Sequence, residues 1–229
     1  MKIVKLKKVD STNKEAFRFL EKYPFVVVTS DIQTAGYGRN NSNWLSVSGN
    51  IHLSIGKITD IESLKYLSVK VVCEVFDLFS RYVSGELKIK WPNDILLNGK
   101  KIAGILIESR VKGNIAKVVI GIGINFNYAP IEGSESLKGK ISISKDKLES
   151  LIIKKLSSVF DSKPNNEILF STVEQNSYFK KGDLISLNSG EKTLKGVFKG
   201  FTPDFAIVIE HEGKEAIFYS GEVKKVRKN

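Results

Sequence analysis

The Asn98-Gly99 pair constrains the fold more than any other local feature of the chain. It stands between two apolar runs, Ile95–Leu97 and Lys101–Glu108. Both central residues of a type I′ turn need positive φ, which Asn and Gly tolerate best. The two runs are therefore predicted to form an antiparallel hairpin in which Lys101 returns alongside Leu96–Leu97, close to the strand end at Asp94.

Apolar periodicity predicts an α+β domain around this hairpin. Further strands are predicted at Lys2–Lys7, Phe25–Thr29, Asn50–Ile58, Leu87–Trp91 and Ile115–Ile124. Helices are predicted at Ser11–Tyr23, Ser63–Val83, Lys145–Phe160 and Asn165–Asn176. Residues 30–50 and 128–144 are expected to be loops.

The pattern changes near residue 177. Short alternating runs follow at Leu184–Leu187, Thr193–Phe201, Ala206–Glu210 and Glu215–Tyr219, with turns expected at Gly182, Ser189-Gly190 and Glu212-Gly213. This spacing is typical of a small β-barrel. We therefore expect two domains, residues 1–177 and 178–229.

Composition excludes several classes of protein. The 229 residues include one Cys and two His, so we expect no disulfide scaffold, no cysteine zinc site and no histidine-rich metal centre. No apolar stretch reaches the length of a transmembrane span, and the N-terminus lacks the apolar core of a signal peptide. A cytoplasmic protein without a membrane partner is expected.

The net charge of +11 suggests an anionic partner. The basic residues are spread along the chain, however, which favours a solvated Lys-rich surface over a nucleic-acid groove. A non-catalytic, basic nucleic-acid-binding protein stays open as an alternative of another functional class.

Three glycine-bearing segments remain to be interpreted. Gly36–Trp44 lacks the Gly-Lys-Ser/Thr ending of a Walker A loop, and Gly121-Ile-Gly123 is not followed by a helix, as a Rossmann fingerprint requires. Glycines inside strands, including Gly104, instead indicate close approach of a ligand or another backbone.

Charged and amide groups gather near these glycines in the sequence. Lys101 is flanked by apolar and small residues, which makes it a candidate anion binder. With Arg39, Asp94 and two asparagines, it forms a set suited to electrostatic stabilisation of a phosphoryl–carboxyl transition state. The set does not fit a nucleophile-and-base mechanism.

These motifs, taken in order, resemble those of biotin protein ligases. The matching segments are Ser11-Thr12-Asn13, Gln33-x-Ala-Gly36-x-Gly38-Arg39 with Trp44, Lys90-Trp-Pro-Asn-Asp94, Lys101-Ile-Ala-Gly104-Ile-Leu-x-Glu108 and Gly121-Ile-Gly-Ile-Asn125. The resemblance implies a catalytic domain like that of class II aminoacyl-tRNA synthetases, a mixed sheet flanked by helices, closed by an SH3-like domain. It implies activation of biotin by ATP to biotinyl-5′-AMP, with Mg²⁺, and transfer to a lysine of a biotin carboxyl carrier domain.

The resemblance also implies roles for individual residues. The catalytic residues would be Lys101, Arg39 and Asp94, with Asp94 also a candidate Mg²⁺ ligand. Biotin would be bound by Ser11, Thr12, Asn13, Gln33, Gly36, Tyr37, Gly38, Arg39, Lys101 and Gly104. The nucleotide would be bound by Arg39, Trp44, Asn93, Lys101 and Asn125. Homodimers are common in that family, and the oligomeric state stays open here.

The chain departs from the family loop, which reads Gly-Arg-Gly-Arg-x-Gly-Arg-x-Trp. Tyr37 replaces the first Arg, Asn41 the third Gly and Ser42 the last Arg, so Arg39 is the only charged residue left in the loop. The early position of Ser11 leaves no room for the DNA-binding domain of some members, so no DNA partner is expected. A lipoyl or octanoyl ligase of the same fold is the enzyme alternative, disfavoured because its Arg- and Gly-rich motif ending in His is missing.

Simpler structural roles explain some of the same residues. Thr12-x-x-Glu15 fits a helix capping box without any ligand. Trp91, before a proline at a strand end, is expected to pack in the core, whereas Trp44 on a polar loop is expected to contact ligand.

Overall fold

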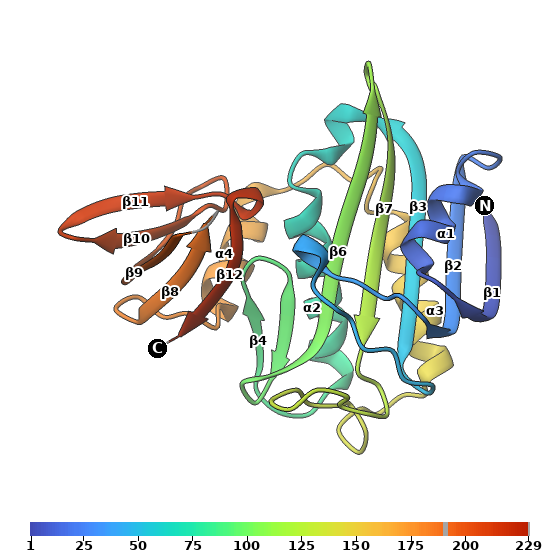
Figure 1. Cartoon of the computed structure of the whole chain (residues 1–229), viewed down its shortest axis with the longest axis horizontal. Helices are drawn as coiled ribbons and strands as arrows, with labels where there is room; N and C mark the ends of the chain where they lie inside the picture. Colours follow the sequence, from blue (N-terminus) through green and yellow to red (C-terminus); the bar gives the residue numbers. More distant parts are fainter. Residues whose placement is uncertain (190–191, 229) are drawn as a thin grey trace.

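The computed structural model describes residues 1–189 and 192–228 and contains two β-sheets that lie side by side (Figure 1). The larger sheet has seven strands in the order β1-β2-β3-β7-β6-β5-β4. Its strands are β1 (Lys2–Val9), β2 (Phe25–Gln33), β3 (Ile51–Asp60), β4 (Leu87–Lys90), β5 (Asp94–Leu97), β6 (Lys100–Lys112) and β7 (Ile115–Ile124). β1 pairs with β2 in parallel and all other neighbours are antiparallel, so the predicted mixed sheet is confirmed.

The predicted hairpin is confirmed in its register. Leu96 pairs with Lys101 and Leu97 with Lys100. Asn98 and Gly99 have φ of 50° and 78°, as a type I′ turn requires. β6 then continues to Lys112, four residues beyond the prediction.

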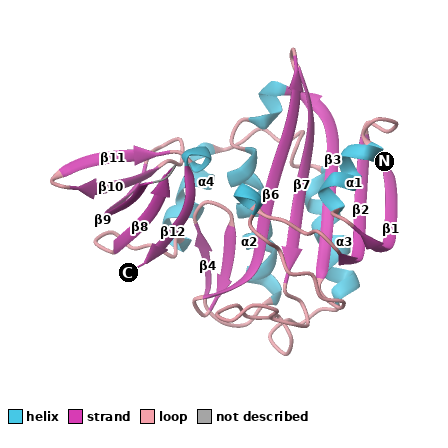
Figure 2. Cartoon of the chain, viewed as in Figure 1, coloured by secondary structure: helices cyan, strands magenta, loops and turns pink. Residues whose placement is uncertain are grey.

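Four α-helices accompany the larger sheet and its connections: α1 (Thr12–Phe19), α2 (Leu67–Tyr82), α3 (Lys145–Ser157) and α4 (Asn166–Asn176). Short 3₁₀ turns lie at η1 (Arg39–Asn41), η2 (Ile61–Leu64) and η3 (Ser220–Glu222). Helices α2 and α3 cover one face of the sheet and α1 lies on the other (Figure 2). The helix predicted over Ser11–Tyr23 is shorter than expected, because the chain leaves the α-helix in a turn after Phe19.

Strand alternation divides the sheet into a core face and a site face. Val27, Leu53 and Ile120 pack into the main core under α2 and α3. Their neighbours Val26 and Val119 point the other way and pack against α1. Since side chains alternate along each strand, this opposite face also carries the polar and glycine positions of the site.

The smaller sheet has five strands in the order β11-β10-β9-β8-β12. They are β8 (Leu184–Ser189), β9 (Lys192–Phe201), β10 (Ile207–His211), β11 (Lys214–Phe218) and β12 (Val223–Lys228). Strands β11 and β12 are its two ends, and no ladder joins them within the described residues, so the closed barrel that we predicted is not formed. The turn expected at Ser189-Gly190 reaches outside the described residues.

Trp91, predicted to pack in the core, follows β4 of the larger sheet and connects the two sheets, which the sequence did not indicate. The indole is only 6% exposed and packs with the core of the smaller sheet. Its Nε1 donates to the carbonyl oxygen of Phe205 at 2.9 Å. No described helix is long and apolar enough to span a membrane.

Candidate functional site

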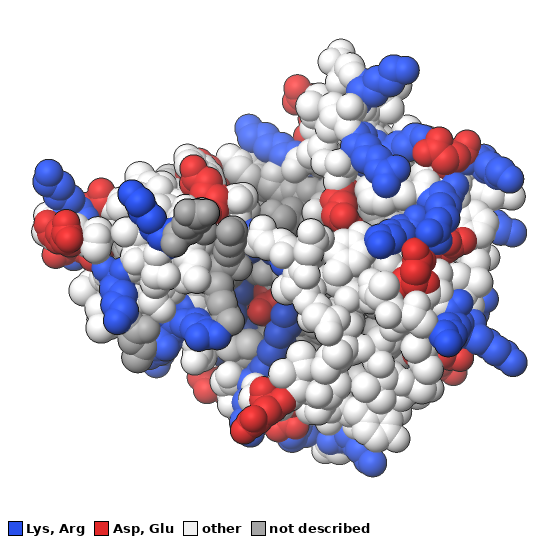
Figure 3. All heavy atoms as spheres, viewed as in Figure 1, with Lys and Arg blue, Asp and Glu red and all other residues white. Residues whose placement is uncertain are grey.

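A cavity of about 500 Å³ lies on the site face, where the larger sheet meets the smaller one. Figure 3 shows a furrow between the two parts, with side chains of both charges in it. The cavity is lined by the start of α1, the 36–44 loop, the turn after β4, β6 and β7, and by Asn188, Val223 and Val226 of the smaller sheet. Its size is that of a small-molecule site. All predicted biotin- and nucleotide-binding residues except Gly36 line it.

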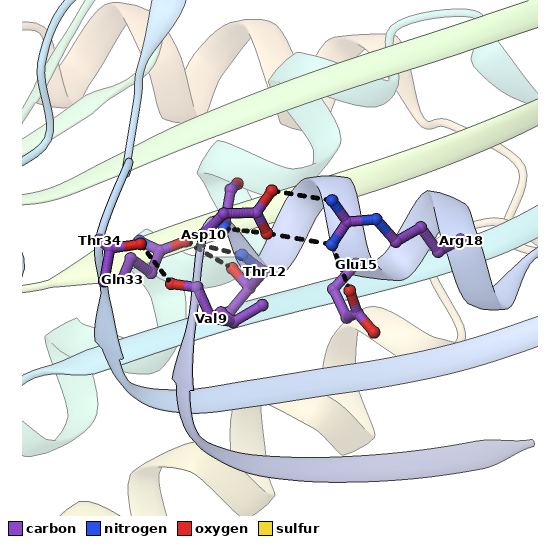
Figure 4. Close-up of polar contacts among 8 residues, drawn as sticks. Val9, Asp10, Thr12, Glu15, Arg18, Gln33 and Thr34 are labelled. Atoms are coloured by element: carbon purple, nitrogen blue, oxygen red, sulfur yellow. Dashed lines mark hydrogen bonds and ion pairs between the residues drawn. The ribbon is translucent and has the colours of Figure 1, made fainter.

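One end of the cavity is a buried polar cluster at the start of α1. Gln33 Oε1 accepts hydrogen bonds from Thr12 N at 2.8 Å and from Thr12 Oγ1 at 3.1 Å (Figure 4). Ser54 Oγ lies 2.8 Å from Thr12 Oγ1. Ser11 and Thr12 are almost fully buried, which is unusual for such residues unless they are paired or bind a ligand.

The capping box that we predicted at Thr12 and Glu15 is wrong. Ser11, not Thr12, is the N-cap residue, and its side chain makes no capping bond. The Glu15 carboxylate instead pairs with Arg18, which also binds Asp10 (Figure 4). The hydroxyl of Thr12 is therefore turned toward Gln33 and the cavity.

Asn13 extends the polar cluster under β7. Its Nδ2 donates to Glu108 Oε2 at 2.7 Å, and its Oδ1 lies 2.6 Å from Ser54 Oγ. A Cβ on Gly121 would lie 2.1 Å from Asn13 Oδ1, so Gly121 makes room for this side chain. Our sequence reasoning assigned no role to Ser54 or to Glu108, although both occupy the polar positions of alternating strands.

The floor of the cavity is made by glycines from neighbouring strands. Gly104 and Gly123 are direct partners across β6 and β7. A Cβ on Gly123 would lie 2.3 Å from Cζ2 of Trp44, and one on Gly104 would lie 3.1 Å from Cζ3 of the same ring. We predicted close approach of a ligand or another backbone at these glycines, whereas the group that approaches them in the structure is the indole side chain of Trp44. The indole Nε1 is buried and has no hydrogen-bond partner among the described residues.

The other end of the cavity is charged. Lys101 Nζ lies 2.7 Å from Asp94 Oδ1, and 5.4 Å from the centroid of the Trp44 ring. Lys101 and Gly104 are three residues apart, so a regular strand would place them on opposite faces. A β-bulge, in which Ile95 pairs with Ala103 and Leu96 with Lys101, brings them to the same face.

Arg39, predicted to contact phosphate, is held by the smaller sheet. Its guanidinium donates to the carbonyl oxygens of Ser220 and Val223. Burial lowers the pKa of Arg39, while the charge of Asp94 opposes that shift. An arginine stays protonated at any physiological pH, so the site keeps a partly desolvated positive charge where the two sheets meet. Nothing in the sequence indicated the contact with Ser220 and Val223.

The 36–44 loop, predicted as irregular, is a short two-stranded ribbon. Tyr37 and Asn43 form an antiparallel bridge, Gly38 N donates to Ser42 O at 2.7 Å, and Trp44 N donates to Gly36 O at 3.0 Å. Asn40 and Asn41 make its tip with φ of 51° and 56°. Asparagine is the residue other than glycine that adopts this conformation most readily.

Asn93 and Asn125 line the cavity, but their amide groups also hold the backbone. Asn93 Nδ2 donates to Ile105 O at 2.7 Å. Asn125 Nδ2 lies 3.1 Å from Glu135 O and 3.3 Å from Lys101 O. Both residues therefore position the strand that carries Lys101.

The residues at the charged end do not fit a resident Mg²⁺ ion. No group of three His, Cys, Asp or Glu side chains within the described residues could hold a metal. Asp94, the predicted ligand, has its Oδ1 against the Lys101 ammonium. Mg²⁺ bound by few protein groups is ordinarily held through substrate phosphates.

A profile of the biotin/lipoate A/B protein ligase family matches residues 4–125, more than half of the chain. The chain belongs to that family. Two curated relatives of this ligase family are informative. The bifunctional ligase/repressor BirA of Escherichia coli is 25% identical over 230 residues, which cover 94% of this chain and 71% of that protein. The biotin--[acetyl-CoA-carboxylase] ligase of Paracoccus denitrificans is 34% identical over 138 residues, 56% of each protein.

A solved structure extends the similarity over the whole chain. The biotin protein ligase from Aquifex aeolicus, in complex with biotin and ATP, superposes with a TM-score of 0.80 and 25% sequence identity. The match covers 100% of this chain and 99% of that one. Both sheets of the present structure therefore have counterparts in a ligase of this family.

Proposed function

We propose that this protein is an ATP-dependent biotin–protein ligase. The observation that carries the proposal is a single cavity with a neutral polar end, a glycine floor and a cationic end, in a chain whose relatives are named as biotin ligases. Biotin has the matching order of groups: a ureido ring that donates and accepts hydrogen bonds, an aliphatic chain and a carboxylate.

The residues at the two ends of the cavity suit different parts of the biotin molecule. Thr12 and Gln33 would bind the ureido ring, and the aliphatic chain would lie on the glycine floor beside Trp44. Lys101 would hold the carboxylate against the α-phosphate of ATP, where negative charge accumulates during the reaction. An ammonium already held in place by Asp94 stabilises such charge with little reorganisation.

Two steps follow from this placement. A biotin carboxylate oxygen attacks the α-phosphorus of ATP, pyrophosphate leaves, and the acyl-adenylate forms. The unprotonated amine of an acceptor lysine then attacks the acyl carbon, the bond to AMP breaks, and the amine loses a proton to solvent. Asp94 positions Lys101, and Arg39 neutralises phosphate charge from the side of the smaller sheet.

The remaining parts of the proposal concern fold class and surroundings. The mixed, largely antiparallel sheet with helices on both faces supports a class II synthetase-like catalytic domain over residues 1–177, and the five short strands support an SH3-like domain over 178–229. We expect Mg²⁺ to enter as the ATP complex, the acceptor to be a biotin carboxyl carrier domain, and the location to be cytoplasmic. The absence of a DNA partner and the homodimer stay predictions.

The first test is exchange of labelled pyrophosphate into ATP, which needs no acceptor protein. We expect exchange that depends on biotin and not on lipoate or octanoate. Lys101→Ala should lower the exchange rate by about 10²–10³-fold, the usual cost of one charge-stabilising donor. Lys117→Ala is the matched control, because Lys117 forms an ion pair with Glu21 at the same 2.7 Å on the same sheet, away from the cavity.

The alternatives predict different outcomes in the same preparation. Exchange with lipoate or octanoate alone would favour the acyl-ligase branch of the family. No exchange with any acid, together with DNA binding that weakens steeply with salt, would favour the nucleic-acid-binding alternative. Equal exchange in Lys101→Ala and Lys117→Ala would remove Lys101 from the mechanism.

A further inference from the structure

A continuous hydrogen-bond network joins the 36–44 ribbon to the polar end of the cavity. Tyr37 Oη donates to Glu108 Oε2 at 2.9 Å, and the same oxygen accepts from Asn13 Nδ2 at 2.7 Å. From Asn13 Oδ1 the network continues to the hydroxyl groups of Ser54 and Thr12, and the backbone N–H of Thr12 donates to Gln33 Oε1. Glu108 is thus the junction between the ribbon and the residues that would bind the ureido ring.

Tyr37, Arg39 and Trp44 each attach the ribbon to the structure around the cavity. Arg39, next to the tip of the ribbon, is hydrogen-bonded to the smaller sheet. Trp44, at the end of the ribbon, packs its indole on the glycine floor of the cavity. Tyr37 is the attachment to β6, through Glu108. The Tyr37 hydroxyl donates to Glu108 rather than to Lys101 or Arg39, so Tyr37→Phe leaves the proposed charge-stabilising side chains in place.

The chemistry of this contact differs from what the family loop pattern would give. A family loop would carry arginine where Tyr37 stands, and an arginine would neutralise the Glu108 carboxylate. Burial, followed by the hydrogen bond to Glu108, raises the pKa of Tyr37 to about 12. The tyrosine hydroxyl therefore stays a donor over the whole working pH range.

We propose that Tyr37, acting through Glu108, is a positioning residue that holds the 36–44 ribbon closed over the cavity and thereby sets how long the acyl-adenylate is retained. This inference rests on the function proposed above. A bond from a neutral donor to a carboxylate is among the stronger hydrogen bonds of proteins. Its loss should raise the opening frequency of the ribbon, and with it the release of the intermediate, on the order of tenfold.

Tyr37→Phe keeps the ring and removes the hydroxyl. Tyr23→Phe is the matched control, because the Tyr23 hydroxyl makes no hydrogen bond within the described residues and the ring stacks with Phe19, 6.3 Å away between centroids. The first readout is hydrogen exchange of the ligand-free protein over residues 36–44, where the amides of Gly38 and Trp44 are bonded within the ribbon. The second is the rate at which labelled biotinyl-adenylate leaves the protein when no acceptor is present.

We expect Tyr37→Phe to accelerate both the hydrogen exchange of residues 36–44 and the release of biotinyl-adenylate by about tenfold relative to Tyr23→Phe. In a double-mutant cycle, Tyr37→Phe should have a smaller effect on a Glu108→Gln background, because the charged acceptor is already gone. Additive effects in this cycle would show that Tyr37 does not act through Glu108.

Unchanged hydrogen exchange, or faster exchange with unchanged release of the adenylate, would overturn the proposal. A wild-type protein that makes no adenylate from any acid would instead refute the proposed function, and with it any role in retention. The ligand-free hydrogen-exchange comparison of Tyr37→Phe with Tyr23→Phe would then still decide whether Tyr37 holds the ribbon.

Discussion

Gly121 and Gly123 sit two residues apart on the site face of β7, yet they should respond differently to alanine. A Cβ at residue 121 would lie 2.1 Å from Asn13 Oδ1, and one at residue 123 would lie 2.3 Å from Trp44 Cζ2. Asn13 is buried and bonded to Ser54 and Glu108, so it has nowhere to move. Trp44 belongs to a surface ribbon and its ring can swing away.

The cost of Gly121→Ala has two parts. Overpacking in a rigid interior costs about 1–3 kcal/mol, and losing the bond from Asn13 to the Glu108 carboxylate costs about 1.5–3 kcal/mol. The alanine also stabilises the folded state by about 0.4–1 kcal/mol, because it lowers the conformational entropy of the unfolded chain. The free energy of unfolding should therefore fall by about 2–5 kcal/mol, which corresponds to a fall in Tm of about 5–20 °C for a chain of this size.

Gly123→Ala should leave the free energy of unfolding within about 1.5 kcal/mol of the wild type and weaken biotin binding instead. Gly221→Ala is the control for both, because nothing lies within 4 Å of a Cβ at that position. Urea unfolding and calorimetric titration with biotin separate the two effects. If Gly121→Ala were as stable as Gly221→Ala, or if Gly123→Ala were the variant that unfolds, the steric assignment of the two glycines would be wrong.

Three further predictions concern the contacts around the cavity. Trp91→Phe should lower the free energy of unfolding by about 1–3 kcal/mol, because it leaves the buried Phe205 carbonyl without its donor; an unchanged urea midpoint would contradict this. Burial lowers the pKa of His52 below 6.5 in the folded protein, so the stabilisation from burying the neutral imidazole is complete above pH 6.5 and declines as pH falls toward the folded-state pKa. In His52→Gln the free energy of unfolding should therefore depend less on pH below 6.5. A pH dependence equal to that of the wild type would refute this assignment. Arg39→Lys should weaken ATP binding about tenfold or more. Nη2 of Arg39 donates to the carbonyls of both Ser220 and Val223 and leaves the other guanidinium N–H groups for phosphate, whereas an ammonium that held both carbonyls would keep a single N–H. Titration with a non-hydrolysable ATP analogue tests this, and unchanged binding would contradict it.

The larger sheet could be predicted from the sequence because its signals are local. The Asn98-Gly99 turn predicts the register of β5 against β6, and the alternation of Ile51, Leu53 and Ile55 indicates which face of β3 packs into the main hydrophobic core. The last strand, β12, was not predicted, because its run Val-Lys-Lys-Val-Arg-Lys is mostly charged. Only pairing with β8 makes it a strand.

The site was predicted less completely, because it depends on contacts between distant residues. The motif residues do line one cavity, but the sequence offered no reason to pair Asn13 with Glu108, 95 positions away, or Arg39 with Ser220. Thr12 and Glu15 matched a capping box in spacing alone. In the structure, the helix begins one residue earlier than that pattern requires, and the Glu15 carboxylate forms an ion pair with Arg18.

The bulge in β6 shows how a small irregularity determines the chemistry of the site. Side chains alternate along a strand, so the three-residue interval between Lys101 and Gly104 would ordinarily turn the ammonium into the core beneath α2. The extra residue, Ile102, is fully buried and changes the parity at this point. Asp94, the partner of Gly104 on β5, then lies on the same face and meets Lys101 at 2.7 Å. The motif Lys-Ile-Ala-Gly thus combines a cation and a glycine floor on one surface, and the spacing of the motif has this function only because the strand is bulged.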